Sequence, residues 1–442
     1  MSRPRVAIVG AGVSGISAAY ELRGRTELTI FERDERPGGH ANTVGVRDGG
    51  RDLGIDTGFI VFNRRTYPQL SAFFEELGVE SLDHSGGFNF FDMDSGLQYG
   101  TAELDLGKEE VRARYPEQFV NIWREARRFH RRGQRDYVRG RTNVPMGEYL
   151  EAGGYSEDFK YSYVILLGSA VWSVPAELIW EMPASTVIGF FMTHDPGGLG
   201  GREIDWKTVS DGSRRYVGRA LEEIDPELRL STEVTAVREL PDGVEVDTAG
   251  GGAERFDAAV VATHADQALA ILEEPGDLAR RVLSSVRYAP STATLHSDPS
   301  VLPPDRSRWQ SWNYGRVVRD GRIRTYVVWW MNKLQGFEAE RDYFLTLDCP
   351  VPIARDAIVR EIPYTHPVIS VEVRDLQQEI YEVNEGGRVK LCGSYFHSKQ
   401  LGPDLIASHE AAFSSGGEAG RAVLRQLEES SQAATVAPIN SP

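Results

Sequence analysis

The sequence predicts an α/β fold in which a domain built on a parallel sheet is interleaved with a second, α+β domain. Two observations lead to this prediction: three separated blocks alternate strand and helix signals, and two long inserts of different character lie between them. A chain of 442 residues is also long enough for two or three compact units. We expect the parallel-sheet domain to comprise residues 1–62, 216–280 and 386–427, the second domain 63–215 and 281–385, and a disordered tail 428–442.

The first block opens with a short apolar run, Val6 to Val9, which is typical of a fully buried parallel strand. A helix is expected to follow as far as about Leu22, and Leu28 to Glu32 is predicted to be the next strand. The second block, near 229–263, holds two segments that alternate with period two and a further apolar strand. The third block begins with a strand, Arg388 to Cys392, and ends in a helical stretch.

The two inserts hold all eight tryptophans of the chain. Such aromatic content suits a domain whose side chains wall an apolar cavity, and it suits equally a domain whose core is filled by large rings. The longest uncharged run, Tyr161 to Ala176, is about two residues short of a membrane-spanning helix and contains Pro175. A buried core or a substrate tunnel fits this run better.

Composition narrows the classes of partner. Sixty-five acidic residues against 49 basic ones give a formal net charge of −16, which argues against nucleic acid and against anionic membrane surfaces. The two cysteines, Cys349 and Cys392, can build neither a disulfide framework nor a zinc site, so we expect a reducing compartment and no metal. The apolar N-terminal stretch is interrupted by glycines and has no small-residue cleavage site. We therefore expect a cytoplasmic protein with no signal peptide and no integral membrane segment.

Directly after the first strand stands the motif Gly10-Ala11-Gly12-Val13-Ser14-Gly15, which has GxGxxG spacing. In this context Gly10 allows a tight turn, Gly12 lets backbone amides approach a pyrophosphate, and Gly15 lets the helix pack on the strand. The helix N-terminus that begins at Val13 and Ser14 adds N–H groups and a partial positive charge for the phosphates. The motif predicts a Rossmann-like dinucleotide-binding domain.

Glu32, at the end of the second strand, is placed to accept both hydroxyls of a ribose that lacks a 2′-phosphate. Glu32 followed by Arg33, a few polar residues and the pair Gly38-Gly39 resembles the extended dinucleotide motif of the amine oxidase and phytoene desaturase class of FAD proteins. The resemblance implies that this glycine pair passes under the pyrophosphate and ribityl chain, where no side chain fits. It also implies that Gly58, Phe59 and Ile60 belong to a second segment that contacts the flavin ring.

His40 occupies the position where amine oxidases usually have arginine. One interpretation makes it a neutral hydrogen-bonding residue beside the pyrophosphate. The other makes it a residue that contacts or tunes the flavin, because histidine can change charge near neutral pH. A covalent flavin link is a third alternative.

The resemblance extends over most of residues 5–340. The stretches GGHANTV (38–44) and DLGIDTGFIVFNRRTYPQLSAFFEELGV (52–79) are similar to a bacterial group of predicted FAD-binding oxidoreductases, and to the N-terminal oxidase-like domain of plant cyclopropane fatty acid synthases. Further matching segments occur in the expected order at 169–173, 190–194, 206–208, 212–217, 311–313 and 330–336.

The same resemblance implies FAD contacts in the second and third blocks. Val234 falls where the class contacts adenine through its backbone, and Ala262 falls where a strand ends near the pyrophosphate. Gly393 and Ser394 occupy the segment near the phosphates and the ribityl chain. Ala412 and Phe413 lie in a terminal stretch, 411–420, that resembles the helix whose N-terminus points at flavin O2, where partial positive charge would stabilise an anionic reduced flavin.

Three residues in segments expected near the cavity are candidate catalytic residues: His194, Tyr395 and His397. The alternative for each is a buried polar residue with a structural hydrogen bond. The segment from Tyr395 to Leu401 departs from the tyrosine- and glycine-rich stretch of the bacterial group. The sequence also shows no counterpart of the lysine that holds a water near flavin N5 in many amine oxidases.

The resemblance implies an FAD-dependent oxidase or dehydrogenase that removes a hydride from a C–H bond next to nitrogen or next to a double bond. The aromatic inserts suggest an apolar or amphiphilic organic substrate, with O2 or another electron acceptor. The resemblance also suggests a role in a biosynthetic pathway. One alternative is a fatty-acyl dehydrogenase or desaturase linked to modified lipid synthesis. Another is a non-redox flavoprotein, either an isomerase or cyclase or a partner subunit. The sequence does not indicate an oligomeric state.

Overall fold

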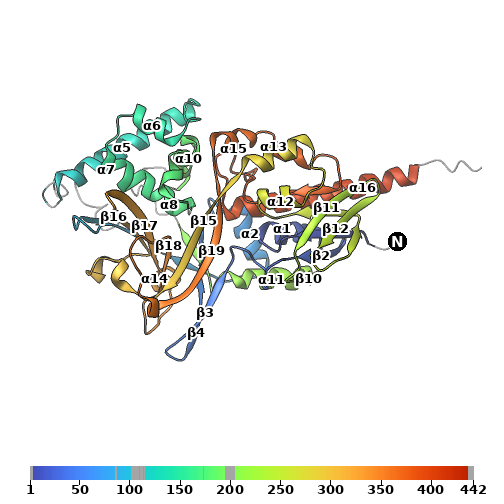
Figure 1. The fold of residues 1–442 in the computed structure, drawn as a ribbon, viewed down its shortest axis with the longest axis horizontal. Coiled ribbons are helices and arrows are strands. Elements are labelled where there is room, and N and C mark those ends of the chain that lie inside the picture. The colour runs from blue at the N-terminus through green and yellow to red at the C-terminus, as the bar shows by residue number, and fades with distance from the viewer. Residues whose placement is uncertain are drawn as a thin grey trace, which may run out of the picture.

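The structure is a computed structural model, and it describes residues 3–84, 87–100, 109, 113, 115–172, 174–194 and 205–436. Figure 1 shows two lobes, with a helix-covered parallel sheet on one side and a second sheet with a helical cap on the other. Long strands of the second sheet run between the lobes.

The first lobe is built on a five-stranded sheet. Its order is β10 (Glu227–Arg229), β2 (Glu27–Phe31), β1 (Arg5–Val9), β14 (Ala258–Val261) and β20 (Val389–Leu391). Every neighbouring pair in this sheet is parallel. Side chains of β1 and β14 from Val6 to Val9 and from Ala258 to Val261 are at most 5% exposed, as expected for strands covered on both faces. All three separated blocks therefore contribute strands, which confirms the predicted Rossmann-like α/β fold.

Helices α1 (Val13–Leu22), α11 (Arg214–Ile224) and α16 (His409–Val436) cover this sheet, and α1 packs closely on α16. A Cβ on Gly416 would lie 2.1 Å from the carbonyl oxygen of Ser14, so the glycine permits this close approach. Helix α16 continues to Val436, nine residues into the segment for which the sequence predicts a disordered tail. The remainder, 437–442, lies outside the described residues.

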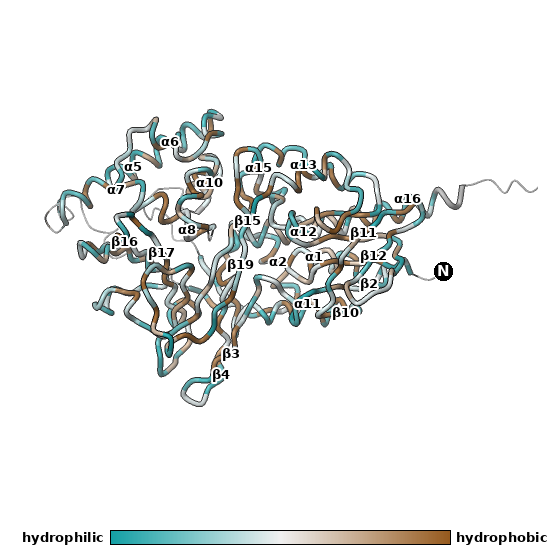
Figure 2. The backbone as a smooth tube through the Cα atoms, in the orientation of Figure 1, coloured by the Kyte–Doolittle hydropathy of each residue, from teal (hydrophilic) through white to brown (hydrophobic). Residues whose placement is uncertain are grey.

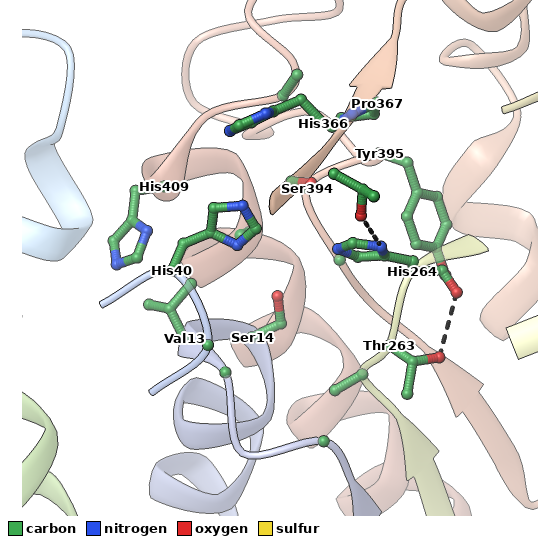
Figure 3. Close-up of a pocket in the computed structure, with 18 of the residues that line it drawn as sticks. Val13, Ser14, His40, Thr263, His264, His366, Pro367, Ser394, Tyr395 and His409 are labelled. Carbon is green, nitrogen blue, oxygen red and sulfur yellow. Dashed lines mark hydrogen bonds between the residues drawn. The ribbon is translucent and has the colours of Figure 1, made fainter. Parts of the chain in front are cut away.

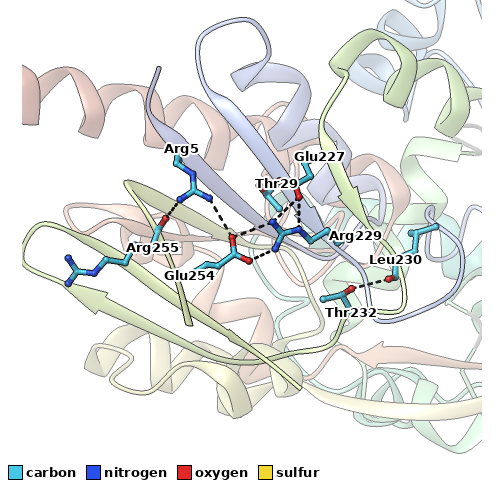
Figure 4. A network of polar contacts seen from close by, with 8 residues as sticks. All are labelled: Arg5, Thr29, Glu227, Arg229, Leu230, Thr232, Glu254 and Arg255. Atoms are coloured by element: carbon cyan, nitrogen blue, oxygen red, sulfur yellow. Dashed lines mark hydrogen bonds and ion pairs between the residues drawn. The ribbon is translucent and has the colours of Figure 1, made fainter. Parts of the chain in front are cut away.

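A three-stranded antiparallel sheet, β11 (Val234–Leu240), β12 (Gly243–Thr248) and β13 (Ala253–Phe256), lies beside the parallel sheet. Figure 4 shows the polar network that joins the two sheets. Arg229 on β10 pairs with Glu254 on β13 and with Glu227, and Arg5 on β1 also reaches Glu254. Helices α12 (Ala265–Ile271) and α13 (Asp277–Ser285) follow.

The second lobe is built on a seven-stranded sheet. Its order is β19 (Ile358–Val368), β15 (Arg287–His296), β18 (Phe344–Leu347), β17 (Arg322–Trp330), β16 (Trp312–Arg319), β7 (Phe88–Asp92) and β8 (Gln98–Gly100). The helical cap consists of α5 (Glu117–Val138), α6 (Met146–Ala152), α7 (Glu157–Phe159), α8 (Ile165–Trp172), α9 (Ala176–Ile179) and α10 (Ala184–His194). A π-helical turn, Lys160–Val164, connects α7 to α8. The described part of the long uncharged run thus forms the π-helical turn, α8 and the first residue of α9, with Val164, Ile165, Leu166 and Trp172 buried and Val171 exposed. No helix in the described part of the chain has the length and apolar character to cross a membrane.

Shorter elements complete the fold. They are α2 (Pro68–Glu76), α14 (Met331–Leu334), α15 (Val371–Leu376), the hairpin β3 (Thr43–Asp48) and β4 (Arg51–Asp56), and the sheet of β5 (Val61–Phe62), β9 (Trp206–Val209) and β6 (Ser81–His84). Short 3-10 turns occur at 299–301, 306–308, 355–357 and 380–384. Figure 2 shows hydrophobic residues along the strands of both sheets and hydrophilic residues on the outer helices, as expected for two lobes that each have a core.

Candidate active site

The two glycine segments, Gly10–Gly15 and Gly38-Gly39, are separated in the sequence but lie against each other at the end of β1. The Gly38 N–H donates to the Ala11 carbonyl oxygen at 2.8 Å, and Gly12 and Gly38 form a parallel bridge. Gly38 has φ +108°, and a Cβ there would lie 2.7 Å from the carbonyl oxygen of Ala41. By contrast, a Cβ on Gly12 would meet no atom of the protein within 4 Å. The backbone at Gly12 therefore faces open space, as a bound pyrophosphate requires.

Charged side chains flank these segments. The Glu32 carboxylate accepts hydrogen bonds from the Ala11 N–H at 2.8 Å and from the Asp34 N–H at 3.0 Å. Each carboxylate oxygen keeps a lone pair for a further donor, such as a ribose hydroxyl. The Arg36 guanidinium donates to the Gly39 carbonyl oxygen at 2.8 Å. This hydrogen bond places the positive charge of the Arg36 guanidinium beside the backbone where the two phosphates of the cofactor are expected.

A cavity of about 710 Å³ begins at these segments and is lined by residues of both lobes. Most of the predicted FAD-site residues line it, together with one predicted catalytic residue, Tyr395. The cavity is lined by Gly10, Gly12, Val13, Ser14, Glu32, Arg33, Gly38, Gly39, His40, Gly58, Phe59, Val234, Ala262, Gly393, Ser394, Tyr395 and Ala412.

Four predicted site residues with described side chains do not line the cavity. Gly15 packs α1 on β1, because a Cβ there would lie 2.0 Å from the Gly10 carbonyl oxygen. Phe413 packs on Phe73 with ring centroids 4.7 Å apart, and Ile60 belongs to an apolar cluster of the second lobe. His397 lies behind the wall, where its Nδ1 is 3.1 Å from Gln377 Oε1. His194 ends α10, and its side chain lies outside the described residues.

Four histidines line the middle of the cavity: His40, His264, His366 and His409. Figure 3 shows them on different segments with their rings gathered around one space. The His40 ring stacks on Tyr364 at 4.8 Å and lies 5.2 Å from the His366 ring and 6.3 Å from the His264 ring. The His409 ring stacks on Phe59 at 4.0 Å, and its Nε2 is 2.7 Å from the Tyr216 hydroxyl.

Burial holds all four imidazoles neutral at pH 7. It lowers the pKa of His40 well below its usual value, and the neighbouring His366, His264 and His409 lower it further. The pKa falls to about 4 for His366 and to about 3 for His409, and that of His264 is also lowered. Neutral imidazoles can each accept one proton or one hydrogen bond. Nε2 of His40 is buried and has no hydrogen-bond partner among the described residues, so it is free to bond a group in the cavity.

Tyr395 lies in the cavity wall with its ring 2% exposed. Its hydroxyl has no partner among the described residues, and burial raises its pKa well above the usual value. A neutral phenol of this kind can donate a hydrogen bond but cannot serve as a base near pH 7.

The far end of the cavity is apolar. Val171 and Trp172 of α8, Phe190 of α10 and Ile362 of β19 contribute to it, as do Leu401, Leu405 and Ile406 from the segment before α16. Among the described residues that line the cavity there is no lysine. Charged groups lie mainly at the glycine end, so the other end suits an uncharged, apolar group.

Helix α16 begins at His409 on the cavity wall, and Ser408 accepts from the Ala411 N–H at 3.1 Å. The positive end of the helix dipole therefore faces the cavity and favours negative charge there. No group of three or more His, Cys, Asp and Glu in the described part of the chain has a geometry that could hold a metal ion.

Sequence reasoning missed several cavity residues. Arg36 lies among the polar residues between Glu32 and Gly38 but was not predicted to contact the site, and His264 follows directly after Ala262-Thr263. His366 and Tyr364 come from β19, which has no motif of its own, and His409 precedes the terminal segment.

The chain matches the family model described as "Flavin containing amine oxidoreductase" over residues 13–300. It is 53% identical over 45 residues to protoporphyrinogen oxidase 2 of Arabidopsis thaliana, which is 10% of this chain and 9% of that protein. It is 24% identical over 271 residues to (S)-6-hydroxynicotine oxidase of Paenarthrobacter nicotinovorans, which is 58% of this chain and 59% of that protein. The chain thus spans less than two thirds of the length of either relative.

Among solved structures, cyclohexylamine oxidase from Brevibacterium oxydans has the same fold. The TM-score is 0.69 at 14% identity, and the match covers 96% of this chain and 100% of the other. The open space at Gly12, the Glu32 carboxylate and the unpartnered Nε2 of His40 fit an FAD molecule laid along the cavity. The chain therefore belongs to the family of flavin-containing amine oxidoreductases.

Proposed function

We propose that the protein removes a hydride from a C–H bond next to nitrogen or next to a double bond of an apolar or amphiphilic substrate. The observation that carries this proposal is the single cavity that joins the glycine segments to an apolar end under the cap helices. A substrate carbon held at that end would lie against the cofactor with water excluded. FAD supplies the acceptor for the hydride, and O2 or another acceptor would take the electrons afterwards.

The residues of the glycine end would hold the cofactor. Glu32 would bond the ribose, Arg36 and the N-terminus of α1 would face the phosphates, and Gly38-Gly39 would leave room for the chain between them. The N-terminus of α16 would stabilise negative charge at the ring end.

A neutral imidazole in the cavity would accept a proton from the substrate. An amine that arrives protonated must lose a proton before a hydride can leave its carbon, and a neutral histidine near the ring end is suited to accept that proton. We propose His366 for this role, because it lines the cavity among the other imidazoles and burial keeps its pKa at about 4, so that it is neutral at pH 7. Trp172 and Phe190 would position the apolar part of the substrate.

An anaerobic reduction assay tests the proposal. Purified FAD-loaded protein is mixed without oxygen with n-alkylamines of increasing chain length and, separately, with fatty acids and acyl thioesters, and the flavin absorbance is followed. Bleaching that accelerates with chain length is expected, and Trp172→Ala should slow it more than Trp172→Phe does. A bound flavin that no amine and no acyl compound reduces would overturn the proposal, and conversion of a compound without bleaching would favour a non-redox flavoprotein.

A further inference from the structure

Positive charge is concentrated in one part of this acidic chain. Residues 124–141 contain eight arginines and two acids, Glu125 and Asp136, which is a net charge of +6 with histidine neutral, in a chain of net charge −16. Most of these arginines belong to α5, the longest helix of the cap, at the outer edge of the second lobe (Figure 1).

The arginines of α5 lie on the face opposite its buried one. Successive helical residues turn by about 100°, so side chains four or seven positions apart share a face. The exposed residues Arg124, Arg127, Arg128, Arg131, Arg135 and Val138 fall on one side, and the buried Ile122, Ala126, Phe129 and Gly133 fall on the other. We call these exposed arginines, together with Arg139 and Arg141, the arginine face.

Most of the arginine face is not neutralised. Arg128 pairs with Glu125, and Arg135 pairs with Asp136. Arg124, Arg127, Arg131, Arg139 and Arg141 form no ion pair with any described residue. An ordinary exposed helix intersperses both signs of charge, whereas both acids in this segment lie partly or fully buried.

The arginine face ends beside a second cavity of the protein. Val138 at its end is 78% exposed, and the next turn, with Tyr137, Gly140 and Asn143, lines this second cavity of about 340 Å³. Asp404 lines this second cavity and also the main one. Its carboxylate is held by Arg374 Nε at 2.8 Å and by the Tyr137 hydroxyl at 2.7 Å. Asp404 is therefore common to the second cavity and to the main cavity, which is also lined by its neighbours Leu405 and Ile406.

We propose that the arginine face docks the protein on an anionic phospholipid surface. Clustered arginines on one helix face are attracted to anionic headgroups, and an exposed aliphatic side chain at the edge can enter the interface. The choice of lipid over other polyanions rests on the proposed apolar substrate, which would partition into a membrane and enter through the neighbouring second cavity. The net charge of the whole chain argues against anionic membranes only if that charge is evenly spread, and it is not.

Vesicle sedimentation tests this inference on the FAD-loaded protein of 442 residues. Vesicles of phosphatidylcholine alone are compared with vesicles that also contain phosphatidylglycerol, at low and at high salt. We expect binding only to the phosphatidylglycerol vesicles, weakened at least tenfold at high salt. The variant Arg124→Glu/Arg131→Glu/Arg139→Glu should lose at least tenfold in the partition coefficient.

A matched variant controls for net charge. Arg25→Glu/Arg319→Glu/Arg360→Glu makes the same charge change at exposed arginines that also lack ion pairs with described residues, and it should bind like the parent. Equal loss in both triple variants, or no binding by the parent protein, would overturn the inference. So would binding of RNA or of heparin through the arginine face without binding to vesicles. Because the readout is vesicle binding, its failure leaves the redox proposal to the reduction assay.

Discussion

Gly12 and Gly15 belong to one motif, but the structure separates their roles. Gly12 has φ −74° and ψ 178°, which any residue adopts, and a Cβ on it meets nothing within 4 Å. A Cβ on Gly15 would lie 2.0 Å from a backbone oxygen of the same loop. Thus Gly12→Val should fold with an unchanged melting temperature of the apoprotein but bind FAD at least tenfold more weakly, because the side chain fills the pyrophosphate space. Gly15→Val should prevent the protein from folding, because its side chain would overlap the backbone of Gly10.

Flavin fluorescence titration and thermal melts of both apoprotein variants measure these outcomes. A Gly12→Val protein that retains FAD as the parent does would show that the pyrophosphate lies elsewhere.

His40 combines a ring that packs with a nitrogen that has no described partner. His40→Phe keeps a ring to stack on Tyr364 but removes both nitrogens. If Nε2 bonds the cofactor, the variant should lose about 1 kcal/mol of FAD binding, or several-fold in dissociation constant, with no loss of apoprotein stability. Equilibrium titration with FAD gives the comparison. Unaltered affinity with slower reduction would instead assign His40 to the substrate.

At the scale of elements, the buried carboxylate of Asp56 accepts hydrogen bonds from three other segments of the chain. Asp56, at the end of β4, accepts hydrogen bonds from the Ser213 N–H and hydroxyl ahead of α11 at 2.9 and 2.8 Å. It also accepts from the Thr43 hydroxyl on β3 at 2.6 Å and from Gln335 Nε2 after α14 at 3.3 Å. Burial raises the pKa of Asp56 to about 6, so the group is mainly ionised at pH 7.

Asp56→Asn should therefore lower the free energy of unfolding by about 2 kcal/mol at pH 7, because an amide presents N–H groups to these donors. Chemical denaturation measures the change. Asp52→Asn on the same strand is the control, since the Asp52 side chain is 82% exposed, and it should have little effect. If the Asp56 variant and the parent unfold with equal free energies, the hydrogen bonds to Asp56 do not stabilise the fold as described.

The elements also show what sequence could predict. Strand β1, the glycine turn and α1 form a local unit whose geometry follows from neighbouring residues, so the sequence predicted it and the residues around it. Strand β19 brings Tyr364 and His366 to the same cavity through pairing with β15, a contact between residues tens of positions apart. Such a side-chain position depends on register and on the packing of two lobes, which no local pattern encodes.

The polar stretch after Glu428 was predicted as a tail, whereas its glutamate, glutamine and alanine residues are good helix formers that extend α16.

At the scale of the whole molecule, buried histidines set the response to acid. Burial lowers the pKa of seven histidines, at positions 40, 84, 264, 296, 366, 397 and 409. Each stays neutral in the folded protein but binds a proton in the unfolded chain below about pH 6.5, so its contribution is full above that pH and is lost as the pH falls. Two buried carboxyls, Asp56 and Glu410, have pKa values raised to about 6 and about 7, and their effect is opposite.

Because the histidines outnumber these carboxyls, the melting temperature should fall between pH 7.5 and about 5. Each histidine held near pKa 4 costs about 2 kcal/mol at the lower pH. Calorimetry of the apoprotein across this range measures the slope. A melting temperature that rises toward pH 5 would contradict the burial of these rings.

The central claim is that one cavity between two lobes holds the cofactor and the substrate together. The most direct measurement is the anaerobic absorbance spectrum of the FAD-loaded protein during titration with a long-chain amine. The account predicts loss of the oxidised flavin band, at a rate that Trp172→Ala lowers at the apolar end and that depends on a neutral histidine at the ring end. A flavin whose spectrum no amphiphilic amine or acyl compound shifts or bleaches would contradict it.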